Sequence, residues 1–202
     1  MALTLEDALN QLSDRSSAKR RSAAKRLRKL ADSTSGPALL QALQLEIADS
    51  RTWETQYEMI QAIGACGYRP ALEFLSELAH QPTEFSALHL ALGDSIVRLR
   101  SPEEGFAAPL GWCLDRGYPL LIDGSLRAVA VLHAALDIDT VNRVLEFLDP
   151  LDPYDGLRYW AAVAAAEWPG DRVGAFLESC MAGPRADVAD AAATSLRIRN
   201  QV

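Results

Sequence analysis

Apolar residues recur at intervals of three and four positions along nearly the whole chain. In one such stripe, Leu27, Leu30 and Ala31 follow Ala23 and Ala24. This spacing places side chains on one face of an α-helix. Alternating apolar and polar runs, and tight hairpin turns between them, are almost absent, so few residues favour a β-strand. The pattern predicts an all-α protein.

Prolines divide this helical pattern into short segments. Because proline is tolerated in the first turn of a helix and blocks its interior, we expect helices to start at or near these residues. They are Pro37, Pro70, Pro102, Pro119, Pro153, Pro169 and Pro184. The predicted helices span residues 4–12, 16–31, 36–48, 52–65, 69–80, 84–99, 104–115, 119–134, 138–148, 154–167, 171–182 and 186–199.

The twelve predicted helices fall into consecutive pairs. The second helix of each pair begins near residue 16, 52, 84, 119, 154 or 186. A period of roughly 32–36 residues is typical of an α-solenoid. Such pairs bury their apolar faces only by stacking on their neighbours. We therefore expect one domain over residues 1–202.

The repeat resembles a HEAT repeat. In that family the second helix typically opens with an acid, has an arginine about six residues later, and continues as A-x-x-L. The segment from Asp14 to Leu27 fits this pattern, and Gln56 stands near the arginine position of the second pair. The run as a whole is similar to small bacterial HEAT-repeat proteins. The resemblance implies a right-handed α-α superhelix of about six helix pairs.

In HEAT repeats the acid and the arginine bridge neighbouring repeats. The resemblance therefore implies a structural ladder, in which acids at helix starts also favour the helix dipole. Its predicted members are Asp14, Arg20, Asp123, Arg127, Asp155 and Arg158.

Charge is distributed unevenly along the chain. The formal net charge is −7, yet residues 1–30 hold eight bases and three acids. The remainder is acidic, which disfavours a protein that binds nucleic acid over its whole surface. We interpret residues 1–34 as a basic N-terminal capping repeat, whose outer face must be polar.

The inner surface of a solenoid is its usual binding face. Large aromatic residues beside charged ones are typical of protein-binding hot spots. The candidate protein-binding residues near the starts of the second helices are Trp53, Glu54, Tyr57, Asp94, Tyr159 and Trp160. These residues favour a non-enzymatic protein-binding scaffold, adaptor or partner inhibitor. An acidic surface suits a partner with a basic patch or an extended basic segment.

Two alternatives remain open from the sequence. The basic run from Lys19 to Lys29 could contact a few phosphates of a nucleic acid, although it contains neither aromatic residues nor glycines. Some HEAT-like proteins resemble enzymes, namely alkylpurine DNA glycosylases and phycobilin lyase subunits. This chain is shorter than the usual glycosylase array, and its similarity to the lyases is limited to the repeat.

Residues of catalytic or metal-binding character are scattered. The three histidines and three cysteines are widely spaced, which predicts neither a metal site nor a disulfide framework. Phosphate-binding and nucleotide-binding glycine motifs are absent. We therefore expect no cofactor. The N-terminus has no basic region followed by an apolar run, and no apolar run is long enough for a membrane span, so we expect a cytoplasmic protein.

Overall fold

A computed structural model describes residues 3–81 and 87–201. These residues form α-helices, short 3-10 helices and turns, with no strand among them. The odd-numbered helices are α1 (Leu5–Gln11), α3 (Gly36–Glu46), α5 (Leu72–His80), α7 (Ala107–Leu114), α9 (Ile138–Leu148) and α11 (Arg172–Met181). The even-numbered helices are α2 (Ser17–Leu30), α4 (Trp53–Ala65), α6 (Ala87–Glu104), α8 (Pro119–Val131), α10 (Tyr159–Ala164) and α12 (Ala186–Arg199).

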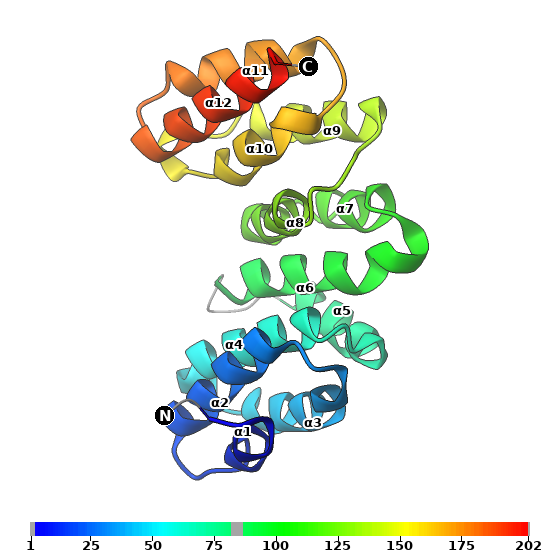
Figure 1. Ribbon diagram of the computed structural model, residues 1–202, viewed down its shortest axis with the longest axis vertical. Helices are drawn as coiled ribbons and strands as arrows, with labels where there is room; N and C mark the ends of the chain where they lie inside the picture. The colour runs from blue at the N-terminus through cyan, green and yellow to red at the C-terminus, as the bar shows by residue number, and fades with distance from the viewer. Residues whose placement is uncertain (1–2, 82–86, 202) are drawn as a thin grey trace.

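The helices form two layers. Helices α2, α4, α6, α8, α10 and α12 each pack on the next and make one continuous row, called the even row below. Most odd-numbered helices pack on their even-numbered partner, and α9 packs on α7. Figure 1 shows the helices stacked along the long axis, with the N-terminus near the bottom and the C-terminus at the top. The expectation of an all-helical protein is confirmed.

The predicted helices agree with the structure, with two main departures. Pro102 does not start a helix: α6 extends to Glu104 and contains Pro102 in its last turn, where the missing N–H costs one helical hydrogen bond and the helix ends two residues later. The segment predicted as a helix over 154–167 is broken into α10 and two 3-10 helices, η4 (Pro153–Asp155) and η5 (Ala165–Glu167). The first residues of the predicted 84–99 helix lie outside the described residues.

Helices α6 and α8 approach each other backbone to backbone. A Cβ atom on Gly93 would lie 1.9 Å from the carbonyl oxygen of Leu121, and one on Gly124 would lie 2.0 Å from that of Leu90. Both distances are far below van der Waals contact, so any side chain here would push the two helices apart. The middle of the even row therefore depends on glycine at two positions.

Three long side chains near the starts of even-numbered helices make the same kind of hydrogen bond to backbone carbonyl oxygens. Arg20 donates to the carbonyl oxygens of Asp14 and Arg15 at 2.8 and 3.1 Å. Gln56 donates to the carbonyl oxygens of Glu46 and Asp49. Arg158 likewise donates to three carbonyl oxygens, those of Leu148, Asp149 and Leu151. Each donor thus ties the start of an even-numbered helix to carbonyl groups at the end of the preceding helix or turn, some of which also accept a backbone N–H.

Aspartates repeat a second task six or seven residues before these donors. The carboxylates of Asp14, Asp49 and Asp152 each accept a hydrogen bond from the backbone N–H two residues later. Such caps order the turn that leads into the next helix. In the fifth pair the aspartate of this device is Asp152, whereas the sequence analysis chose Asp155. Asp155 is exposed and makes no side-chain hydrogen bond or ion pair that involves the described residues.

The proposed pair Asp123 and Arg127 also departs from the expected ladder. Both residues lie inside α8 rather than at its start, and they do not pair with each other. Arg127 reaches across to Tyr57 and Gln61 on α4 and to Asp94 on α6. Arg127 therefore connects neighbouring even-numbered helices, as a ladder residue should, with partners that the sequence analysis had not assigned to it.

Asp123 is buried without a compensating contact. Asp123 is 9% exposed, and its Oδ1 has no hydrogen-bond partner among the described residues. Burial raises the pKa of Asp123 to about 6, although the positive charge of Arg127 acts in the opposite direction. The ionised form of a buried carboxylate is unfavourable when no donor forms a hydrogen bond with it.

Candidate functional site

An open pocket of about 280 Å³ lies between α2 and α4. Three of the predicted binding residues, Trp53, Glu54 and Tyr57, line it together. The other lining residues are Arg21, Lys25 and Glu58. Trp53 begins α4 and Tyr57 lies one helical turn later, so the two aromatic side chains share a face of the helix. We call this the α2–α4 pocket.

Ion pairs from α2 neutralise the acids of the α2–α4 pocket. Arg21 pairs with Glu54. Lys25 and Arg28 lie 3.8 and 3.2 Å from the carboxylate of Glu58. Glu54 therefore stands beside a guanidinium, and the pocket presents both signs of charge next to two aromatic rings.

The same ion pairs bear on the basic run from Lys19 to Lys29. Besides Arg21, Lys25 and Arg28, two further bases are paired: Lys19 with Asp14 and Arg20 with Glu46. Arg26 donates to the carbonyl oxygen of Leu3. Most of the positive charge in this helix is thus balanced by acids of its own and the following pair.

Asp94 lies inside the protein rather than on its surface. It is 1% exposed, and its carboxylate accepts from the Nε of Arg98 at 2.9 Å. The Nε of Arg127 lies 3.4 Å from the other carboxylate oxygen. Gln61 also donates to Asp94. Asp94 therefore joins α4, α6 and α8, and the structure contradicts the expectation that it offers an exposed acid to a partner.

Tyr57 connects the α2–α4 pocket to this buried network. Its hydroxyl oxygen accepts a hydrogen bond from Arg127 at 3.3 Å. Arg127 is held in turn by Gln61 and Asp94. The ring of Tyr57 is thus fixed in position before a ligand arrives, which lowers the entropy lost on binding.

Tyr159 and Trp160 form a separate cluster. Their rings meet edge to face with centroids 4.9 Å apart, and both pack partly against the core at the start of α10. Helices α6 and α8 stand between this cluster and α4 in the even row. The structure therefore divides the predicted binding residues into two aromatic clusters rather than one continuous surface.

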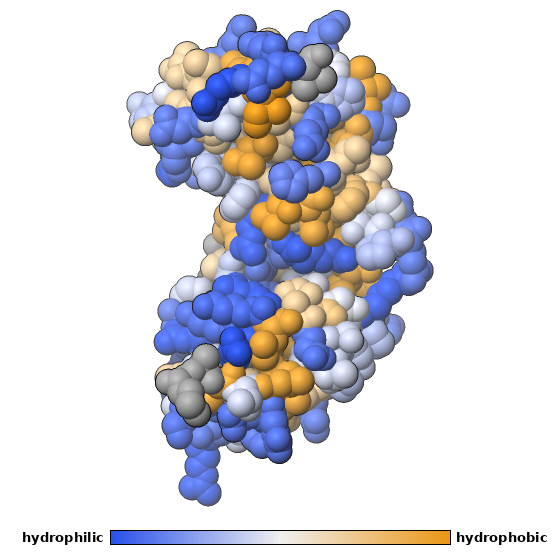
Figure 2. All heavy atoms as spheres, in the orientation of Figure 1, coloured by the Kyte–Doolittle hydropathy of each residue, from blue (hydrophilic) through white to orange (hydrophobic). Residues whose placement is uncertain are grey.

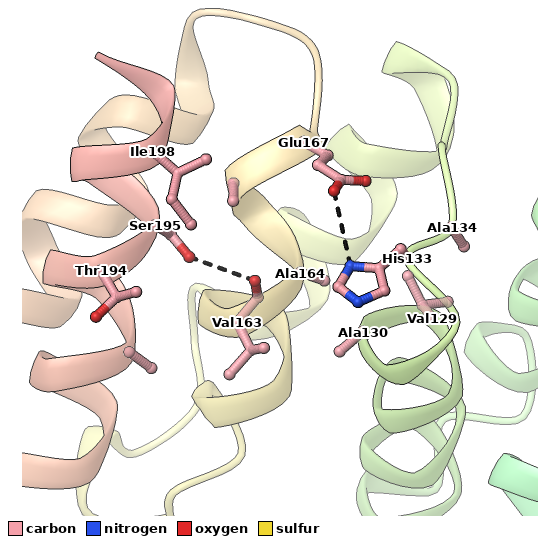
Figure 3. A pocket seen from close by; sticks show the side chains of 12 residues that line it. Val129, Ala130, His133, Ala134, Val163, Ala164, Glu167, Thr194, Ser195 and Ile198 are labelled. Atoms are coloured by element: carbon pink, nitrogen blue, oxygen red, sulfur yellow. Dashed lines mark hydrogen bonds and ion pairs between the residues drawn. The ribbon is translucent and has the colours of Figure 1, made fainter. Parts of the chain in front are cut away.

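The sequence analysis missed a groove at the C-terminal end of the even row. It has a volume of about 220 Å³, and its lining comes from the end of α8, from α10 with η5, and from α12. Figure 3 shows Val163 and Ala164 at its floor, with Ile198 and Thr194 on one side and His133 and Glu167 on the other. The lining is mostly alanine and valine. We call it the C-terminal groove.

The C-terminal groove arises from short elements and small side chains. Helix α10 covers only Tyr159–Ala164 between the longer helices α8 and α12. Its neighbours contribute small residues, so the space above α10 is not filled. At the rim Nδ1 of His133 lies 3.7 Å from Glu167. Figure 2 shows apolar surface over α8 next to hydrophilic surface at the level of α6.

The cysteines are not arranged as nucleophiles. All three are buried and none forms a disulfide. Burial raises the pKa of Cys113 to about 12 and that of Cys180 to about 11, and it also raises the pKa of Cys66. A thiol with a raised pKa carries little of the reactive thiolate. Among residues 3–81 and 87–201, no group of three or more potential ligands could hold a metal ion.

Comparisons with family models and with curated protein sequences found no match for this chain. Within the described residues, every helix is too short or too polar to cross a membrane.

Proposed function

We propose that this chain is a HEAT-like α-solenoid that binds another protein through its even row, as a non-enzymatic scaffold, adaptor or inhibitor. The proposed superhelix is right-handed, as the resemblance to HEAT repeats implies. Its main support is the α2–α4 pocket, where Trp53 and Tyr57 stand partly exposed beside charged side chains. Aromatic residues in a partly preformed pocket are typical anchors of protein interfaces.

The even row also supplies the shape that such a partner needs. In Figure 2 the outline of the molecule is hollowed on the left at about the height of α8, where Figure 1 places even-numbered helices. A partner lying along the even row would cross the helices that carry the α2–α4 pocket and the Arg127 network. Because the chain beyond residue 30 has twice as many acids as bases, a segment with basic residues would be attracted at long range.

Nucleic-acid binding receives less support. The bases of α2 that would contact phosphates are largely paired with acids, as described above. A phosphate would have to compete with carboxylates that are already in place. Arg15 and Lys29 are exposed and make no ion pair within the described residues, so they are the bases through which this alternative can be tested.

The experiment that tests the proposal compares two aromatic substitutions. The partner is first identified by co-purification from the native cell and mass spectrometry, and the affinity of the purified pair is then measured by calorimetry. Removing an anchor typically costs about 2 kcal/mol, so Trp53→Ala should weaken binding roughly 30-fold. Tyr154→Ala is the matched control, since Tyr154 is 69% exposed and lies far along the chain from α4.

Two results would count against the proposal. The first is equal binding by the Trp53→Ala variant and the wild type, with both proteins folded. The second is loss of binding only when Arg15 and Lys29 are changed to glutamate, which would favour the nucleic-acid alternative. Lys25 and Arg28 are unsuitable for this comparison, because their reversal would leave Glu58 among like charges and disturb the contact between α2 and α4.

A further inference from the structure

Arg116 and Trp112 form a cation–π pair beside His80, in the odd-numbered layer. The guanidinium carbon of Arg116 lies 3.2 Å from the centroid of the Trp112 ring. His80, at the end of α5, meets the same ring edge to face at 5.7 Å. Nη2 of Arg116 lies 2.8 Å from Nε2 of His80. Two segments 36 residues apart therefore position one guanidinium.

The contacts of Arg116 are all with uncharged groups. Nη1 donates to the carbonyl oxygen of Trp112 at 2.8 Å. The other partner is the ring of His80, whose Nδ1 contacts the carbonyl oxygen of Ser76 and so carries the proton. Within the described residues no carboxylate forms an ion pair with Arg116, and its buried Nε has no partner. The guanidinium keeps N–H groups on Nη1 and Nη2 that these contacts do not use.

A second arginine lies close to this pair. Arg100 stands 5.9 Å from the centroid of the Trp112 ring and pairs with Glu104. Nearby, Arg69 pairs with Glu103. Asp115, whose negative charge also acts on Arg116, pairs with Arg143. The cluster thus holds four guanidiniums and three carboxylates, and one positive charge is left over. Burial lowers the pKa of Arg116, and Arg100 acts in the same direction, because both make the charged form less stable.

Two other arginines that are held near helix ends without a carboxylate, Arg158 and Arg199, differ from Arg116. Arg158 donates to three carbonyl oxygens and Arg199 to two, all at the ends of helices or turns. Those oxygens carry part of the negative end of the helix dipole. Arg116 has one such oxygen and a neutral imidazole nitrogen, so its charge is the least compensated of the three.

We propose that Arg116, stacked on Trp112 and oriented by His80, binds a carboxylate of an acidic side chain from a protein partner. The planar guanidinium offers two parallel N–H groups, which match the two oxygens of a carboxylate. The site lies where the odd-numbered layer meets the C-terminal end of α6: His80 ends α5, Trp112 lies on α7, and Arg116 follows α7. It is therefore separate from the α2–α4 pocket, and neither proposal depends on the other.

The local charge favours a carboxylate over a phosphate. One carboxylate neutralises the single excess positive charge of the cluster. A phosphate group carries about −1.5 to −2 charges at neutral pH, which would leave excess negative charge beside Glu103 and Glu104. Charge repulsion of this kind lowers affinity even where the hydrogen-bond geometry is suitable.

The test is a pair of NMR titrations of the full chain, with sodium acetate and with inorganic phosphate at constant ionic strength. The signals observed are the indole N–H of Trp112 and the guanidinium N–H of Arg116. Acetate should shift both signals along a saturable curve. In variants of Arg116 only the indole N–H of Trp112 can be followed. Charge-assisted hydrogen bonds are strong enough that Arg116→Gln should weaken the response of this signal at least about tenfold. Arg116→Lys should keep the fold and the charge and still lose most of the response.

Arg51→Gln is the matched control, because it removes one positive charge from an exposed arginine that contacts only Asp49. This variant should bind acetate like the wild type. The proposal is overturned if Arg51→Gln and Arg116→Gln weaken the response equally, which would indicate diffuse attraction. It is also overturned if acetate produces no saturable shift, or if phosphate binds more tightly than acetate.

Discussion

The first two helices of the even row pack together through different interactions from the last two. Between α2 and α4 the exposed edge of the row is joined by ion pairs, such as Arg21 with Glu54 and Arg28 with Glu58. Between α10 and α12 the contact is made by alanines and by hydrogen bonds from the Ser195 hydroxyl to the carbonyl oxygens of Ala162 and Val163, at 2.7 and 3.3 Å. Long charged side chains cover the N-terminal contact, whereas small apolar ones leave the C-terminal groove.

Arg20 and Arg158 show the same difference at one equivalent position. Both stand near the start of an even-numbered helix and donate to carbonyl oxygens of the segment before it. Arg20 also forms two hydrogen bonds with Glu46, at 2.6 and 2.7 Å, and the side chain of Glu46 is only 4% exposed. Arg158 has no such acid among the described residues. The same fold therefore tolerates an ionic joint at one end and a neutral one at the other.

The largest expected effect on stability is at the contact between α6 and α8, in the middle of the even row. Gly124→Ala would place a methyl group 2.0 Å from the carbonyl oxygen of Leu90, and two backbones would have to separate. Overpacking against a rigid backbone should lower the free energy of unfolding by about 3 kcal/mol or more. Denaturant unfolding measures this loss.

Gly174→Ala is the control for the same substitution in a helix. Gly174 lies in α11, and a Cβ atom built there meets nothing within 4 Å. Alanine should therefore raise stability by about 0.5–1 kcal/mol, because it reduces the entropy of the unfolded chain. If both variants were equally stable, the close approach of α6 and α8 would not be a constraint.

The second prediction tests the ionic joint against the neutral one. Arg20→Gln keeps a donor for the carbonyl oxygens, as Gln56 does in the next pair, and leaves the buried Glu46 without its cation. We expect a loss of about 3 kcal/mol. Arg158→Gln removes only neutral contacts and should cost about 1 kcal/mol. Thermal unfolding of both variants gives the comparison, and equal losses would show that the two joints do not differ.

The sequence predicted the helices well and the site less well, for physical reasons. Helical periodicity and proline position are local signals, and they indicated all twelve helices. Asp94 illustrates the limit. Nothing near it in the chain reveals that Arg127, 33 residues later, will cover it. The C-terminal groove depends on α10 being short beside longer neighbours, which only the packed structure reveals.

The acid and arginine motif fails in an instructive way at Asp155. The spacing from Asp14 to Arg20 is six residues, and the same spacing leads from Arg158 back to Asp152 rather than to Asp155. The sequence analysis accepted a shorter gap and so chose the wrong aspartate. A strict six-residue rule would have found the residue that caps the turn.

The third prediction concerns Asp123, which lies in α8 in the middle of the even row. Its pKa in the folded protein is about 6, above the ordinary value of 3.8. Between pH 3.8 and about pH 6 the folded state holds a proton that the unfolded state has released. The contribution of this residue to stability therefore falls as pH rises through this range. Above pH 6 the ionised carboxylate costs the folded state up to about 3 kcal/mol.

Asp123→Asn removes this ionisation. The variant should be more stable than the wild type at pH 8 by about 1–3 kcal/mol, and the difference should nearly vanish at about pH 3, where most of the aspartate is protonated in both states. Unfolding curves at the two pH values measure the difference. A constant difference at both values would mean that the charge of Asp123 is not the cause.

The smallest expected effect separates Asp152 from Asp155 in the neutral, C-terminal half. Asp152 accepts the backbone N–H of Tyr154 at 2.9 Å and so holds the turn that begins η4. Asp152→Ala should lower the melting temperature by about 2–4 °C through the lost cap. Asp155→Ala should change it by less than about 2 °C, since surface changes without partners are nearly neutral. Differential scanning calorimetry of the two variants makes the comparison. A larger loss for Asp155→Ala would restore Asp155 to the ladder, and it would then imply that the fifth pair is joined through a charge, as the first pair is.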